Sequence, residues 1–167
     1  MSKPSEVPRV YLDLDVLSYL VGIPKNEVWK ITIARRILDL ARDGKIVITM
    51  SMAAVEASFS RARLSEPRRR QYLRLLASCL EDVPYERLEP KPEDIEKLAD
   101  LYFEVAGVSK YENAIHIAVA VRLKVDYFLT WDEEHILKER ARKEIQNINE
   151  ERGLKTPNFL KPEEFKP

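Results

Sequence analysis

Two aspartates that follow apolar segments are the residues of this sequence best suited to carry chemistry. Asp13 comes directly after residues 10–12, and Asp132 comes shortly after residues 127–130. If both segments are buried strands of one parallel sheet, their carboxyl ends meet at the edge where such sheets bind ligands. A simpler interpretation is that each aspartate caps the helix that follows it, because its side chain can accept backbone N–H groups. The pattern predicts a shared acidic site and leaves the capping role open.

A third candidate, Glu56, lies among small and apolar residues in a segment that we expect to form a core-facing helix. A buried carboxylate is tolerated when it pairs with a cation or binds a metal ion, whereas an isolated one is not. The sequence therefore predicts that Glu56 joins Asp13 and Asp132 in the site. The alternative is an ion pair with a nearby arginine, such as Arg61 or Arg63.

A hard divalent cation is the partner that these acids predict. Asn113 lies three residues before His116, so both side chains can lie over one face of a helix. His116 is more typical of a satisfied core residue than of a metal ligand. With one cysteine and two histidines in the chain, oxygen ligands for Mg²⁺ or Mn²⁺ fit better than a structural zinc site. Such ions activate water and neutralise phosphate charge during phosphodiester hydrolysis.

One concentrated basic stretch follows Glu56 and could grip the backbone of a nucleic acid. It consists of Arg61, Arg63, Arg68, Arg69 and Arg70. The alternative is a solvated helical face whose charges pair with Glu66 and Glu81. Lysine plus arginine equals aspartate plus glutamate, at 28 each, so RNA binding would depend on a local patch and not on net charge.

Length and composition predict one soluble domain. The 167 residues are close to the usual size of a domain that can bury its own core. Cys79 is the single cysteine, so no internal disulfide can form, and its apolar helical pattern predicts a buried position. No run of 18 apolar residues is present and the first residues are polar, so we expect neither a membrane span nor a signal peptide. We therefore expect a cytoplasmic protein.

The elements that must position these residues alternate between strands and helices. Strands are predicted at residues 9–12, 46–49, 83–88 and 126–130 and near Phe159 and Leu160. Helices are predicted at residues 27–42, from Ser51, from Pro67, at 92–107, at 111–124 and from Glu133 to about Arg152. This order predicts an α/β fold with a central parallel sheet of four or five strands flanked by helices. We expect a core at about residues 9–160 and frayed tails at 1–8 and 161–167.

Three segments resemble the PIN domain, in particular the VapC-like toxin ribonucleases. They are VYLDLDVLSYL at residues 10–20, SMAAVEASF at 51–59 and NAIHIAVAVRLKVDYFLTWDEEHI at 113–136. The resemblance implies a PIN-like three-layer fold and a magnesium- or manganese-dependent endoribonuclease that cleaves single-stranded RNA. It also implies a homodimer, and often a small antitoxin protein that occupies the site of its toxin.

The resemblance also assigns roles to the acids by position. Asp13 matches the first family acid, Glu56 the second, and Asp132 the acid that follows the last strand. Asp15 stands where the family usually has an asparagine. Asn113 occupies the position of a further family acid, where its oxygen can still coordinate a cation but supplies no charge.

Neighbouring residues could support this set. Asp15 or Glu112 could restore the charge that Asn113 lacks. The hydroxyl of Thr130 could orient the phosphate or a ligand water.

Two other functions fit part of the sequence. Because Asn113 is neutral, the chain could be a degenerate PIN domain that binds RNA or protein without cutting. Alternatively, Asp13 and Asp15 resemble the nucleophile and acid of a HAD-type phosphatase, with Thr49 ending a strand as the second motif of that family would. Against the phosphatase, Val16 replaces the small or hydroxylated residue expected after the second acid.

Overall fold

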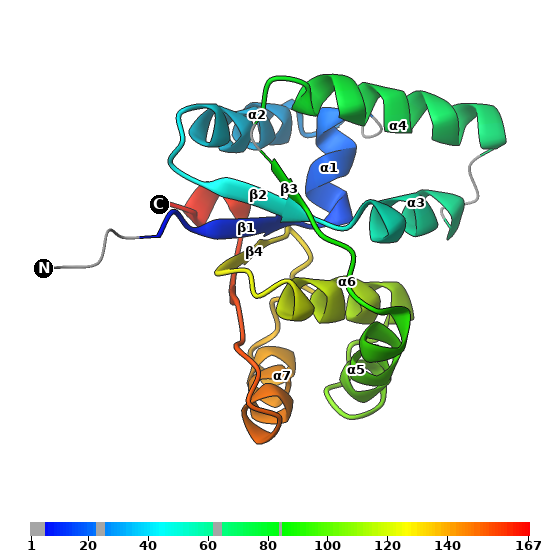
Figure 1. Cartoon of the computed structure of the whole chain (residues 1–167), viewed down its shortest axis with the longest axis vertical. Helices are drawn as coiled ribbons and strands as arrows, with labels where there is room; N and C mark the ends of the chain where they lie inside the picture. The colour runs from blue at the N-terminus through cyan, green and yellow to red at the C-terminus, as the bar shows by residue number, and fades with distance from the viewer. Residues whose placement is uncertain (1–5, 23–25, 62–64, 84) are drawn as a thin grey trace, which may run out of the picture.

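The fold is seen in a computed structural model that describes residues 6–22, 26–61, 65–83 and 85–167, with only the backbone at 59–61. Within these ranges the chain forms a five-stranded, all-parallel sheet in the order β3-β2-β1-β4-β5, which alternates with seven α-helices (Figure 1). This Rossmann-like arrangement confirms the predicted α/β class. No helix in these ranges is both long and apolar enough to cross a membrane.

The elements follow one another in a regular alternation along the chain. Their bounds are β1 Arg9–Leu12, α1 Leu14–Leu20, α2 Val28–Arg42, β2 Val47–Met50, α3 Met52–Arg61, α4 Glu66–Leu80, β3 Tyr85–Arg87, α5 Pro92–Glu104, α6 Tyr111–Arg122, β4 Tyr127–Leu129, α7 Glu139–Glu151 and β5 Asn158–Leu160, followed by a short 3-10 helix, η1, at Pro162–Glu164.

Helices cover both faces of the sheet and enclose two apolar cores. Figure 1 shows α1, α2 and α4 on one face and α5, α6 and α7 on the other. Side chains alternate along a strand, so Val10 and Leu12 enter the first core whereas Tyr11 enters the second. The neighbouring strand β4 divides in the same way, with Leu129 in the first core and Phe128 in the second. This burial on both faces explains why the central strands are nearly continuous apolar runs.

The order of the sheet reverses beside β1. From β1 the chain adds β2 and β3 on one side, and it later returns to add β4 and β5 on the other. Leu12 pairs with Leu129, and the backbone N–H of Asp13 donates to the Leu129 carbonyl at 3.0 Å. The residues that follow β1 and β4 therefore emerge side by side at the carboxyl edge, which is the usual ligand position in such folds.

The helix expected to begin at Glu133 begins later, at Glu139. Residues 133–136 form turns, and the carbonyl of Asp132 accepts the N–H of Leu137 at 3.0 Å. Lys138 is extended, with φ −59° and ψ 129°, and precedes α7 as its N-cap residue. The prediction of one continuous helix was wrong because local hydrogen bonds to Asp132 close a turn in place of the first helical turns.

Two further predictions need correction. The strand expected at residues 83–88 is shorter, since β3 spans Tyr85–Arg87 and Val83 is buried before it. Cys79 is half-buried, not fully buried, and its sulfur lies 3.5 Å from the carbonyl oxygen of Leu20. Val83 belongs to the first core, and Cys79 packs against that core.

The end of the chain packs into the fold, so the fraying expected at residues 161–167 is wrong for this segment. Phe165 is fully buried, and its ring meets that of Tyr127 edge to face at a centroid distance of 5.0 Å. The guanidinium of Arg36 donates to the carbonyls of Pro162 and Phe165 at 3.1 and 3.0 Å. The core therefore extends beyond residue 160.

Replacing Phe165 with alanine should lower the free energy of unfolding by about 3–5 kcal/mol, because it leaves a ring-sized cavity beside Tyr127. Urea denaturation measures this change. Alanine at the exposed neighbour Lys166 is the matched control, with an expected effect below about 0.5 kcal/mol. An unchanged unfolding free energy for Phe165→Ala would show that this segment is not part of the core.

Candidate functional site

The hydroxyl of Thr130 lies at the centre of a group of acids at the carboxyl edge of the sheet. Thr130 is fully buried, and its Oγ1 donates to Asp13 Oδ2 at 2.8 Å. The same oxygen lies 3.2 Å from Asp15 Oδ2 and accepts the backbone N–H of Asp132 at 3.0 Å. A hydroxyl has one proton, so it cannot fully satisfy both carboxylates.

Asp13 both ends the first strand and caps the next helix. Its Oδ1 accepts the N–H of Leu14 at 2.8 Å, and the extended φ and ψ of Asp13 are those of an N-cap residue. The other oxygen faces Thr130. The two interpretations of Asp13 are therefore compatible, since one carboxylate oxygen serves the helix while the other is directed into the site.

Asp15 lies in the first turn of α1 and has one satisfied and one orphaned oxygen. Its Oδ2 accepts the backbone N–H of Trp131 at 2.8 Å. Its Oδ1 is buried and has no hydrogen-bond partner among the described residues. An unpaired buried acceptor is destabilising, more so when it is charged, so this oxygen favours a proton or a cation.

Burial and the negative charges of neighbouring acids raise the pKa values of the Asp13 and Asp15 carboxyls. For Asp15 the largest cause is desolvation, followed by the charge of Asp13, and the hydrogen bonds from Trp131 and Thr130 oppose the rise. For Asp13, desolvation again dominates, and the charges of Asp132 and Glu112 add to it. Four acids thus act on one small buried region that has an affinity for positive charge.

Asp132 and Asn113 meet beside this pair. The amide nitrogen of Asn113, from α6, donates to Asp132 Oδ2 at 2.9 Å, and Asp132 Oδ1 accepts the backbone N–H of His135 at 2.9 Å. An acid at position 113 would face Asp132 with like charge. The asparagine replaces this repulsion with a hydrogen bond, which stabilises the ion-free site at the expense of one negative charge.

Glu56 does not face the core as expected. It is exposed on α3, whereas its neighbours Ala54, Val55 and Ser58 are buried. Its exposure sets Glu56 apart from the buried carboxylates around Thr130. The alternative partners, Arg63 and the side chain of Arg61, lie outside the described part of the chain.

The members of the basic stretch whose side chains the structure describes, Arg68, Arg69 and Arg70, lie in the first turns of α4. Arg68 and Arg70 are exposed, and Arg69 is half-buried. Arg70 forms an ion pair with Glu66 at 2.7 Å, which is one of the contacts expected for a solvated, charge-paired helical face. In Figure 1, α3 and the beginning of α4 lie beyond the carboxyl ends of the strands. The acidic group lies at the same edge, because Asp13 follows β1 and Thr130 follows β4.

His116 is a core histidine, as its position on an apolar helix indicates. It is 1% exposed, and its two ring nitrogens lie 2.5 Å from the hydroxyl of Tyr11 and 2.6 Å from that of Ser58. Both nitrogens therefore have hydrogen-bond partners. The ring links β1, α3 and α6 behind the site.

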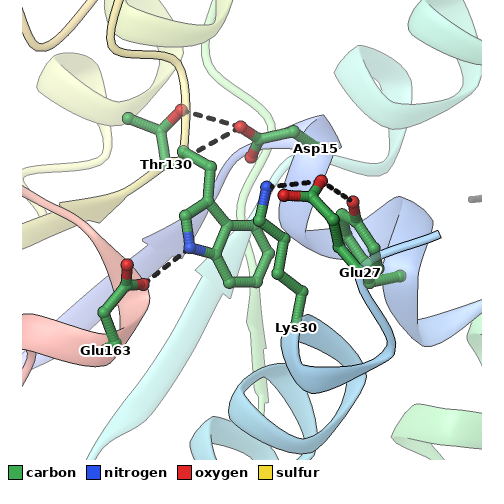
Figure 2. Close-up of polar contacts among 7 residues, drawn as sticks. Asp15, Glu27, Lys30, Thr130 and Glu163 are labelled. Atoms are coloured by element: carbon green, nitrogen blue, oxygen red, sulfur yellow. Dashed lines mark hydrogen bonds and ion pairs between the residues drawn. The ribbon is translucent and has the colours of Figure 1, made fainter.

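Sequence patterns did not single out a second group, which adjoins the carboxylates through Trp131. The Nζ of Lys30 lies 5.1–5.6 Å from the ring centroids of Trp131, Tyr19 and Trp29. Glu27 pairs with Lys30 at 3.0 Å and accepts a hydrogen bond from Tyr19 at 3.1 Å, and these two contacts lower the pKa of Glu27 (Figure 2). The only available signal was compositional, because both tryptophans of the chain belong to this group.

The donor set at the acidic edge fits a magnesium-like ion better than zinc. Among the described residues, no group of three or more His, Cys, Asp or Glu side chains is arranged to hold a metal ion. Mg²⁺ is commonly held by one or two carboxylates, with water and substrate phosphate completing its shell. Asp13 and Asp15, with the orphaned Oδ1 of Asp15, provide such a pair.

A surface hollow of about 890 Å³ lies elsewhere, at the opposite end of the sheet. Its walls include Arg9, Lys124, Asp126 and Lys155, near the amino ends of β1 and β4. The ion pair between Lys155 and Asp126 and that between Arg9 and Glu86 already use charged groups at this end. We therefore locate the candidate site at the acids and not at this hollow.

Comparison with models of known protein families found no match, and comparison with curated proteins found none either.

Replacing Asp15 with asparagine should stabilise the ion-free protein at neutral and higher pH. Because the folded state raises this pKa, it binds more protons than the unfolded chain between pH 3.8 and the raised value. The free energy of unfolding therefore falls as pH rises through that window. Asparagine does not titrate, so the variant lacks this pH-dependent loss of stability. We expect a gain of roughly 1 kcal/mol, or about 2–4 °C in Tm, at pH 8 in a chelator and a smaller gain at pH 5.

Thermal melts of the two proteins at both pH values measure this difference. The control is Asp39→Asn, which removes an exposed carboxylate that pairs with Arg42 on the surface of α2. A lower Tm for Asp15→Asn at pH 8 would mean that the carboxylate of Asp15 stabilises the ion-free fold, contrary to this account.

Proposed function

We propose that this protein is a metal-dependent endoribonuclease of the PIN type that hydrolyses phosphodiester bonds of single-stranded RNA. The observation that carries the proposal is the crowding of Asp13 and Asp15 around the single hydroxyl of Thr130, with one carboxylate oxygen unpaired. The three PIN-like sequence segments support it. So does the reversal of strand order beside β1, since this group lies at the edge where that reversal occurs.

The residues at this edge would have different roles in binding the ion and orienting its ligands. Asp13 and Asp15 would hold a Mg²⁺ or Mn²⁺ ion, and Asp132 with Asn113 would complete its surroundings. When bound, such an ion lowers the pKa of a water molecule and neutralises phosphate charge. Thr130 would fix the orientation of the carboxylates through its hydrogen bonds.

Other residues would meet the RNA further from the acids. Glu56 is exposed on α3 and would act from the rim of the site, where it can approach the substrate or its ion. The basic stretch at Arg61, Arg63, Arg68, Arg69 and Arg70 would contact backbone phosphates. Glu112, whose charge acts on Asp13, would add to the negative potential that attracts the ion.

The PIN resemblance extends the proposal to cellular role and assembly. By analogy with VapC-like proteins, the chain would be the toxin of a toxin–antitoxin pair in the cytoplasm. It would act as a homodimer and be controlled by a small antitoxin protein.

Asn113 favours a second candidate, which is a degenerate PIN domain that binds RNA or a protein without cutting. Its amide donates to Asp132, so the site holds one negative charge fewer than it would with an acid at this position. Metal-dependent cleavage separates the two candidates.

The test is cleavage of a mixed single-stranded RNA pool with Mg²⁺ or Mn²⁺, and with a chelator. Asp13→Asn should reduce cutting to the chelated background, because it removes a charge yet keeps an oxygen that can accept the N–H of Leu14. Asn113→Asp should increase metal-dependent cutting, since it restores a negative ligand.

Asp126→Asn is the matched control, because it alters an acid beside the opposite end of the central strands. It should leave the cutting rate unchanged. Absence of cutting by the wild type and by Asn113→Asp would reject the nuclease and favour the binding module, and equal cutting by Asp13→Asn would remove Asp13 from the mechanism.

A further inference from the structure

Three aromatic rings beside the acids form a second feature of the carboxyl edge, which we call the aromatic platform. It consists of Tyr19 from α1, Trp29 from α2 and Trp131, which follows β4. The ring of Trp131 meets Tyr19 at a centroid distance of 5.3 Å and Trp29 at 6.2 Å, both nearly edge to face. The platform thus joins three separate segments of the chain.

Trp131 couples the platform directly to the acids. Its backbone N–H donates to Asp15 Oδ2 at 2.8 Å, and it immediately precedes Asp132. Its indole Nε1 donates to Glu163 Oε2 at 2.6 Å, which fixes the orientation of the ring (Figure 2). A ligand phosphate at the acids would therefore lie next to a rigid aromatic surface.

Lys30 fills the space among the three rings. Its ammonium interacts with all of them, pairs with Glu27, and leaves the side chain 15% exposed. The interior of the cluster is therefore already occupied by a cation, so the platform is not a cage for a cationic ligand. The most exposed of the three rings is Trp29, at 50%, whereas Trp131 is half-buried and Tyr19 is buried.

Trp29 is exposed and meets the oriented ring of Trp131 beside the proposed phosphodiester site, so it is suited to stacking with a nucleobase. Proteins that bind single-stranded nucleic acids use such rings because each base has a π face, whereas the backbone is held by charge. Glu27 offsets the charge of Lys30, so the platform itself is close to neutral and would contribute stacking more than phosphate attraction.

We infer that the aromatic platform is a base-stacking subsite, in which a nucleobase of single-stranded RNA next to the scissile phosphate packs on Trp29. The inference rests on the proposed function for its substrate class. It assigns Trp29 to substrate binding and Trp131 to a positioning role, since Trp131 links the platform to Asp15.

Intrinsic fluorescence offers a readout that does not require cleavage. Trp29 and Trp131 are the two tryptophans of the chain, so emission excited at the red edge of the tryptophan band, where the seven tyrosines absorb little, reports on the platform. A six-nucleotide oligoadenylate added in the presence of a chelator should quench this emission. An abasic oligonucleotide of the same length should bind more weakly and quench it less.

A double-mutant cycle then tests the contact itself. Anisotropy of the labelled oligoadenylate, again with chelator, should show about tenfold weaker binding for Trp29→Ala, and a smaller loss for Trp29→Phe, which keeps a ring. On the abasic oligonucleotide Trp29→Ala should have no further effect. Tyr85→Ala is the matched control, because it removes another exposed aromatic side chain, on the far edge strand β3, and should not alter affinity.

The possible failures are distinguishable. Equal binding of oligoadenylate by wild type and Trp29→Ala, or equal binding of the normal and abasic oligonucleotides, would overturn the stacking subsite even if metal-dependent cleavage persists. Quenching and the Trp29 effect in a protein that never cuts RNA would support the subsite while rejecting the nuclease. Thermal melts of each variant verify that it is folded.

Discussion

The contact between the Thr130 hydroxyl and two carboxylates is the constraint on which the acidic edge depends. It joins residues that are 117 and 115 positions apart in the chain, and only the pairing of β4 with β1 brings them together. One hydroxyl proton cannot satisfy both Asp13 and Asp15. The pair therefore favours binding of a further proton or of a cation. The fold thus concentrates negative charge at the point where the sheet order reverses, and this concentration is the basis of the proposed chemistry.

Much of this arrangement was predictable from the chain. The apolar runs before Asp13 and Thr130 are long enough and β-branched or aromatic enough to indicate central strands. Once both strands belong to a parallel sheet, their following residues must meet at one edge. The capping role of Asp13 was predictable as one of two interpretations, because the side chain of an aspartate between a strand and a helix can accept a backbone N–H at the start of that helix.

The features that were missed or wrong have physical causes. On α3 the small residues give little contrast between faces, and Ala53 is exposed while Ala54 is buried, so the pattern did not define the side on which Glu56 lies. The turn at residues 133–136 is held by hydrogen bonds to Asp132. The same residues have a helix-like sequence pattern, so the pattern alone does not distinguish the turn from a helix. The cluster around Lys30 joins three segments, and no periodicity within one segment can reveal a contact of that kind.

Asn113 shows how stability and function oppose each other at this edge. Its hydrogen bond to Asp132 relieves repulsion in a region where burial already raises the pKa values of two acids. An acid at this position would supply a charge that an ion could use, and the asparagine does not. A site of this kind is expected to be more stable without its ion and to bind that ion less tightly than a site with an acid at this position.

The most direct measurement is calorimetric titration of the protein with Mn²⁺ at pH 7 in two buffers of different ionisation enthalpy. If the carboxylates around Thr130 form a cation site, Mn²⁺ will bind and release protons, since binding displaces protons from groups whose pKa values are raised. The heat will then depend on the buffer, and both binding and release will be lost when Asp13 and Asp15 are replaced together by asparagine. Absence of Mn²⁺ binding, or binding unaffected by that double substitution, would contradict the assignment of the acidic edge as a metal site.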